Sequence, residues 1–208
     1  MIEWLEERWY SLAKHYLDID LQDNYWRNIH QQYSARSRHY HNLKHLYHMF
    51  QELDSFKDAI EDIHALEFAI WYHDIIYKST KSDNEEKSAE LAKKELKLSN
   101  FDENRLKKVE KLIISTKKHE LILKENEDNA YLLDLDLSIL GSDWTNYQSY
   151  IKNIRKEYKI YPKLIYNPGR KKVLSNFIER EHLFFTTRFR DRFESIAREN
   201  IQREIEML

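Results

Sequence analysis

The sequence predicts an all-α protein, and three features carry that prediction. Only 2 of its 208 residues are Gly and 2 are Pro, whereas sheet-based folds need many more turn residues. Apolar residues recur at helical spacing along most of the chain. Hydrophobic residues make up 41% and aromatic residues 13%, which suffices for a sizeable core. The length fits one domain, which we expect to span 1–208 and to end in a long helical segment.

Apolar periodicity and helix-start residues divide the first part of the chain into six elements. The expected helices cover 1–17, 25–33 behind a cap at Asp23 or Asn24, 40–56, 58–76, 84–98 and 102–115. The segment 58–76 is the most apolar of them, so we expect it at the centre of the core.

The second part is predicted from the same patterns. We expect a helix over 131–141 with Gly141 as its C-cap, and another from Trp144 to about 161. Asn167, Pro168 and Gly169 form the clearest turn signal, and 171–208 reads as one or two long helices.

Charge and cysteine content exclude several classes of protein. The balance of 34 basic and 36 acidic residues gives a net charge of −2, so nothing indicates a nucleic-acid partner. The absence of Cys excludes disulfides, thiolate metal sites and a cysteine nucleophile. The acidic N-terminal segment is unlike a signal peptide and no apolar run is long enough to span a membrane, so we expect a cytoplasmic protein without a membrane partner.

Histidines concentrate in one short run. Of the 10 His in the chain, four lie in RHYHNLKHLYH (38–48), and on a helix His41, His45 and His48 would share one face. Neutral imidazole is the commonest metal ligand, so a one-sided cluster suggests a metal site. The alternative is a solvated basic face of a helix.

A second ionisable pair, His73 and Asp74, ends the most apolar helix. Burying two such side chains is costly unless they are paired or bound to a metal. The alternative is a helix-terminal pair that faces solvent.

Asp134 and Asp136 interrupt a third apolar run. On a helix they point about 200° apart, so one suits a ligand and the other a cap or surface acid. Imidazole and carboxylate ligands together suit Mn, Fe, Co, Ni, Mg or Zn as a single divalent ion.

These blocks resemble a known family. RHYHNLKH (38–45), WYHDIIY (71–77), NEEKSA (84–89) and LDLDLSILG (133–141) are similar, in this order, to the H…HD…D signature of the HD-domain superfamily. The narrower resemblance is to a bacterial subfamily of predicted metal-dependent phosphohydrolases. It implies a helical HD-type bundle with a motif core at about 26–142, on which the helices of 143–208 pack.

The resemblance also implies a ligand set. His41 would be the first ligand, His73 and Asp74 the central pair and Asp136 the last. Many HD enzymes carry a further His-Glu pair where this chain has Asn84 and Glu85, which favours one metal over two.

Other residues near the blocks are candidates for catalysis and substrate binding. Glu85 or Glu86 would orient or deprotonate the attacking water, although Glu86 also suits a simple first-turn helix acid. The candidates for contacts to a phosphoryl group are Arg38, His45, Lys117, His119 and Arg170. A surface position is the alternative for His119.

The resemblance implies a metal-dependent phosphohydrolase that acts through a metal-activated water on a small phosphorylated metabolite, with a nucleotide as the leading candidate. One alternative is a pyrophosphohydrolase of nucleoside triphosphates or of an alarmone. Another is a non-catalytic HD module that binds metal together with a nucleotide or a protein. The charged C-terminal helix also allows a homodimer.

Overall fold

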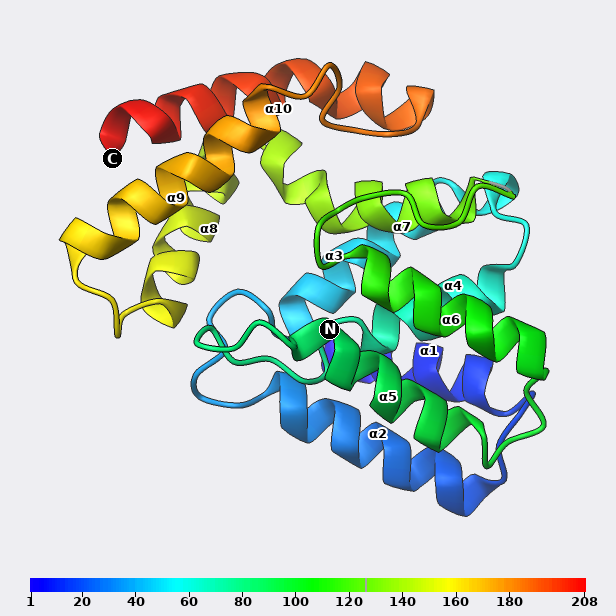
Figure 1. Cartoon of the computed structure of the whole chain (residues 1–208). Coiled ribbons are helices and arrows are strands. Elements are labelled where there is room, and N and C mark those ends of the chain that lie inside the picture. Colours follow the sequence, from blue (N-terminus) through cyan, green and yellow to red (C-terminus); the bar gives the residue numbers. More distant parts are fainter. Residues whose placement is uncertain (126) are drawn as a thin grey trace. The chain divides into compact units, whose positions relative to one another are not determined.

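The computed structural model describes residues 1–125 and 127–208, which form ten α-helices, two short 3-10 helices and no strand (Figure 1). The all-α prediction is therefore confirmed for the described part of the chain. The elements are α1 Ile2–Ala13, α2 Ile19–Tyr33, α3 Leu43–Asp54, η1 Lys57–Ala59, α4 Ile63–Tyr72, α5 Asn84–Leu96, α6 Glu103–Ser115, α7 Asp128–Leu137, η2 Ser138–Gly141, α8 Trp144–Glu157, α9 Lys163–Ile178 and α10 Thr187–Met207.

The chain divides into two compact units, residues 1–132 and 133–208, and the boundary falls inside α7. In the described residues, no helix is both long enough and apolar enough to cross a membrane.

Helix α4 is the central helix of the first unit, as its composition predicted. All residues from Ala65 to Tyr72 are buried, and α3, α5 and α6 pack against it. The ring of Trp71 lies 5.8 Å from Trp9 of α1, 6.1 Å from Trp26 of α2 and 4.6 Å from Phe50 of α3, measured between centroids. Helices α5 and α6 lie side by side (Figure 1). The end of α4 is thereby fixed from several directions.

In the second unit, α10 packs on η2, α9 and α8. Gly141 was expected as a left-handed C-cap, but it has no positive φ. A Cβ at this position would lie 2.5 Å from the Cβ of Phe193 and 2.9 Å from its carbonyl oxygen. The glycine is required because α10 approaches the backbone of η2 closely.

The predicted helix starts are partly wrong. Helix α2 begins at Ile19, where Asp18 caps it by accepting from the Leu21 amide at 2.9 Å, and not behind Asp23 or Asn24. The first turn of α2 is exposed, so it carries no apolar periodicity that would mark the start of the helix behind Asp18. The helix expected over 102–115 is confirmed as α6, and the Asp102 side chain caps it by accepting from the amides of Asn104 and Arg105.

Two predicted helices are shorter than expected because side-chain caps start them later. Asn42 accepts from the Lys44 amide and begins α3 at Leu43, and Asp62 accepts from the Ala65 amide and begins α4 at Ile63. Helix α4 also ends before His73, which is its C-cap residue.

The prediction of a turn at Asn167, Pro168 and Gly169 is wrong. All three residues lie within α9, with Pro168 as an internal proline. Proline removes the hydrogen bond to the carbonyl four residues earlier. That carbonyl belongs to Leu164, whose side chain is 89% exposed, so the loss falls on a solvent-facing part of the helix. For the C-terminal segment 171–208 we expected one or two long helices. The structure has two, α9 and α10, and α9 begins earlier, at Lys163.

Candidate metal centre

His73 and Asp74 follow directly on the last residue of α4 and are both buried. The exposed fraction is 1% for His73 and 8% for Asp74, so the solvent-facing alternative is excluded. The C-terminal end of a helix carries partial negative charge from its unpaired carbonyl groups. The surroundings of this pair therefore favour a cation.

The hydrogen bonds of His73 fix its tautomer. Its Nδ1 lies 2.9 Å from the carbonyl oxygen of Ile70, and because a carbonyl only accepts, Nδ1 carries the proton and donates it. In the neutral ring Nε2 then holds a lone pair. Metal-binding histidines commonly donate their second ring nitrogen to a backbone carbonyl in this way.

Two other atoms of the kind that bind metal ions lie close to Nε2 of His73. His73 Nε2 lies 3.2 Å from Nε2 of His45 and 3.1 Å from Oδ2 of Asp74. His45, in the first turn of α3, is 5% exposed. A proton on His45 Nε2 can satisfy the first contact, but the carboxylate and the His73 lone pair repel each other unless a positive charge lies between them.

The donor set and its spacing fit a divalent ion. Two ligand atoms about 2.1 Å from a metal and at right angles to each other lie about 3.0 Å apart. The distances of 3.2 Å from His73 Nε2 to His45 Nε2 and 3.1 Å to Asp74 Oδ2 agree with that value. His45 and His73 belong to a group of side chains that can hold a metal ion. Two imidazoles and a carboxylate suit the first-row transition ions and zinc.

His41, the expected first ligand, does not lie on the helix face that its spacing predicted. His41 lies in the loop before Asn42, so it does not share a helix face with His45 and His48. Its ring stacks at 4.2 Å on Tyr77 and lies 6.0 Å from the His45 ring, between centroids. The geometry brings His45 to His73, although the sequence assigned His45 to the substrate.

Arg38, expected to bind a phosphoryl group, lies inside the protein. Its Nη1 donates to the carbonyls of Asp74 at 2.6 Å and His41 at 3.1 Å, and its Nη2 donates to the carbonyl of Ile75 at 2.6 Å. The residue is 8% exposed. Its contacts are with the backbone around the His73–Asp74 turn.

Tyr33 is a residue of this region that sequence reasoning missed. Its hydroxyl donates to the carbonyl of Trp71 at 3.1 Å and accepts from the amide of Asp74 at 3.2 Å. Contacts of a side chain with a distant backbone leave no local pattern, so no sequence signal marks it.

The start of α5 explains part of the NEEKSA block. Asn84 accepts from the Lys78 amide at 3.0 Å and donates to its carbonyl at 3.1 Å. Ser88 binds the amide and carbonyl of Ile76 at 3.1 and 3.3 Å. These two side chains fix the loop that follows the His73–Asp74 turn.

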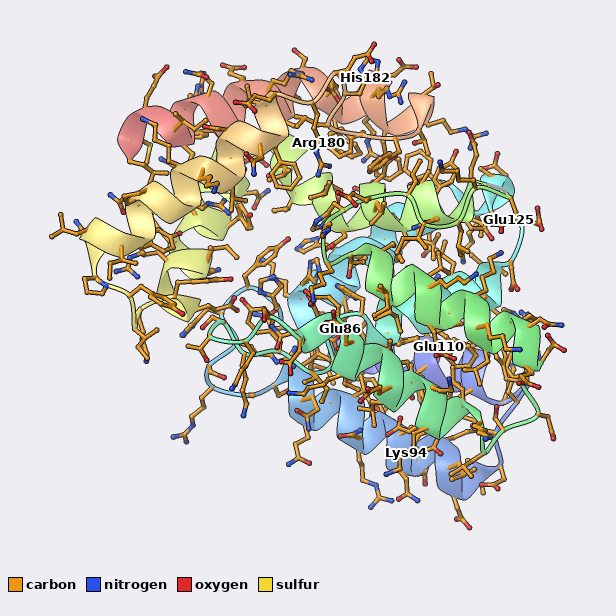
Figure 2. All side chains as sticks on the ribbon, viewed as in Figure 1. Glu86, Lys94, Glu110, Glu125, Arg180 and His182 are labelled. Atoms are coloured by element: carbon orange, nitrogen blue, oxygen red, sulfur yellow. The ribbon has the colours of Figure 1, made fainter. Side chains whose placement is uncertain are left out.

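The two glutamates of the block differ in environment. Glu85 is half-buried, and burial, reinforced by the charges of Asp74 and Glu86, raises its pKa. Glu86, labelled at the start of α5 in Figure 2, pairs with Lys117 at the end of α6. That hydrogen bond lowers the pKa of Glu86 and raises the pKa of Lys117. Glu85 is the better candidate for a general base, because Glu86 is engaged in its ion pair with Lys117.

His119 and Arg170 are the remaining candidates. His119 follows α6 in a left-handed backbone conformation, with a φ of 50°. Arg170 lies in the second unit, where its Nε and Nη2 donate to Glu204 at 2.7 and 3.0 Å and Nη2 donates to Tyr150 at 3.1 Å. At least three N–H groups of Arg170, a residue of α9, therefore donate to partners on α8 and α10.

Asp134 of α7, for which the spacing suggested a cap or surface acid, is not at the surface. Asp134 is fully buried and accepts from the amides of Phe185 and Thr186 at 2.7 and 2.8 Å and from the Thr186 hydroxyl at 2.8 Å. Asp134 thus supports the residue that caps α10. Asp136 lies one helical turn after Leu132, the last residue of the first unit.

No family model, curated protein or solved structure matches this chain. The resemblance to the HD superfamily stays a prediction.

Proposed function

We propose that this protein is a metal-dependent phosphohydrolase of the HD type. The observation that carries the proposal is the buried contact of His45, His73 and Asp74, in which the Ile70 carbonyl leaves the His73 Nε2 lone pair directed at the other two groups. A divalent ion bound by these ligand atoms would stabilise the carboxylate and the two imidazoles in the protein interior.

The proposed ligands are His45, His73 and Asp74. Asp136 is the fourth, on the strength of the family pattern, because the oxygens of Asp134 already accept hydrogen bonds from residues 185 and 186. A divalent ion in such a site lowers the pKa of water and polarises a phosphoryl oxygen.

In the proposed reaction, the oxygen of the attacking water forms a bond to phosphorus and the bond from phosphorus to the ester oxygen breaks. Glu85 takes the proton that the water loses, because it is half-buried and lies within the electrostatic influence of Asp74. The leaving oxygen takes up a proton from solvent. The proposed substrate is a small phosphorylated metabolite of the nucleotide class.

The test is a screen for the release of phosphate and pyrophosphate from nucleoside mono-, di- and triphosphates, with Mn²⁺ added. We expect release with the native chain and its loss in His73→Ala. The matched control is His48→Ala, because His48 lies on α3, the helix that carries His45, but is exposed. Release that survives in His73→Ala contradicts the proposal. Bound metal without release of either product from any substrate assigns the chain to the non-catalytic class.

A further inference from the structure

Arg38 is a buried cation whose acceptors, in the part of the chain that the structure describes, are backbone carbonyls. Two of these belong to consecutive residues, Asp74 and Ile75, which accept from different guanidinium nitrogens at 2.6 Å each. The third is the carbonyl of His41, at 3.1 Å. The planar fork of arginine suits this pair of neighbouring acceptors, because its nitrogens are held apart at a fixed angle.

The hydrogen bonds of Arg38 join the two segments that carry the proposed ligands. The His41 carbonyl lies two residues before the start of α3, whose first turn holds His45. The other two carbonyls belong to the turn that holds His73 and Asp74. The side chain therefore bridges the start of α3 and the end of α4.

Tyr33 supports the same turn from α2. Its hydroxyl joins the Trp71 carbonyl to the Asp74 amide, and its ring lies 4.8 Å from the centre of the Arg38 guanidinium. The ring of Tyr77 lies 5.7 Å from that centre. The two aromatic faces stabilise a buried cation and leave its donors directed at the backbone.

We propose that Arg38 is a positioning residue of the metal centre and not a contact to the substrate. By holding the carbonyls of His41, Asp74 and Ile75, it sets the separation of His45 from His73 and Asp74. The inference rests on the metal centre of the proposed function. It replaces the substrate-binding role that the sequence suggested for Arg38.

The test compares Arg38→Lys with Arg36→Lys, which changes an exposed arginine of the same segment. Lysine keeps the charge but presents its donors from one atom, so it cannot reproduce the two-nitrogen contact. Mn²⁺ affinity, measured by titration of the metal-free protein, is expected to fall about 10- to 100-fold in Arg38→Lys and to stay unchanged in Arg36→Lys. Unchanged affinity in both variants overturns the inference.

Kinetics separate positioning from substrate contact. A positioning role predicts that excess Mn²⁺ restores kcat in Arg38→Lys while the KM for the substrate stays at the native value. A raised KM that excess metal does not restore shows a substrate contact and overturns the inference. Should Arg38→Lys fail to fold, Tyr33→Phe provides the second variant, because it loosens the same turn and keeps the arginine; its Mn²⁺ affinity is expected to fall as well, and native affinity contradicts the inference.

If the proposed function is wrong, the same experiments give a result that can be told apart from a failure of the Arg38 inference. A native chain that hydrolyses nothing but binds Mn²⁺, with weaker binding in Arg38→Lys, refutes the function and supports the role of Arg38. If the native chain binds no Mn²⁺, there is no metal centre for Arg38 to position, and the inference is overturned together with the proposed function.

Discussion

The hydroxyl of Tyr33 gives a sharp stability prediction, because a single oxygen binds two backbone groups of the His73–Asp74 turn. The substitution Tyr33→Phe removes this oxygen and keeps the ring. The side chain is 1% exposed, so water does not replace the oxygen without a rearrangement. The hydroxyl donates to Trp71 at 3.1 Å and accepts from Asp74 at 3.2 Å.

The magnitude follows from these two bonds. Each buried hydrogen bond contributes about 1 kcal/mol net, and each buried backbone group left unpaired costs about 1–3 kcal/mol. Partial relaxation of the turn reduces the sum, so we expect Tyr33→Phe to lower the free energy of unfolding by about 2–4 kcal/mol.

Urea denaturation followed by tryptophan fluorescence measures this change in the first unit. Trp4, Trp9, Trp26 and Trp71 belong to that unit, and only Trp144 belongs to the second. The control is Tyr10→Phe, which removes a partly buried hydroxyl that donates to Asp23 alone and which we expect to cost below about 1 kcal/mol. A Tyr33→Phe variant within about 0.5 kcal/mol of the native chain refutes the reasoning.

Three further predictions concern other buried groups. Arg170→Met leaves Glu204, which is 1% exposed at its side chain, without its ion pair; we expect a loss of about 3–5 kcal/mol in urea unfolding, and a loss below about 1 kcal/mol contradicts the structural role. Gly141→Ala places a Cβ 2.5 Å from that of Phe193, so thermal unfolding should show a destabilisation of about 1–3 kcal/mol, whereas an unchanged Tm means that α10 packs differently. Burial raises the pKa of Glu95 above its ordinary value of 4.5, so its contribution to stability is present below pH 4.5 and is lost as the pH rises through the folded-state pKa. The urea midpoint of Glu95→Gln should therefore decline less than that of the native chain from pH 4.5 to 7, and parallel declines count against this account.

Composition and periodicity predicted the helical fold because they are local signals. The scarcity of Gly and Pro indicated helices, and the apolar run before His73 indicated a central, buried α4 with a buried pair at its end. Helix α6 begins behind Asp102, as a side-chain cap predicts.

The errors arise where tertiary contacts override local signals. Pro168 reads as a turn, but it lies inside α9, a helix that packs on α10. Asn42 caps α3 one residue after His41, so the shared helix face that periodicity suggested for His41 does not form. Side chains that bind distant carbonyls, as Arg38 does, follow no spacing rule, and their role emerges only from the folded chain.

The most direct test of the metal centre is the stoichiometry and affinity of Mn²⁺ binding, measured by the loss of the free-ion electron paramagnetic resonance signal. The native chain should bind one ion. Asp74→Asn should lose this binding, because the amide lacks the negative charge that attracts the cation. His48→Ala should retain it. Native affinity in Asp74→Asn, or no binding to the native chain at millimolar Mn²⁺, contradicts the proposed centre.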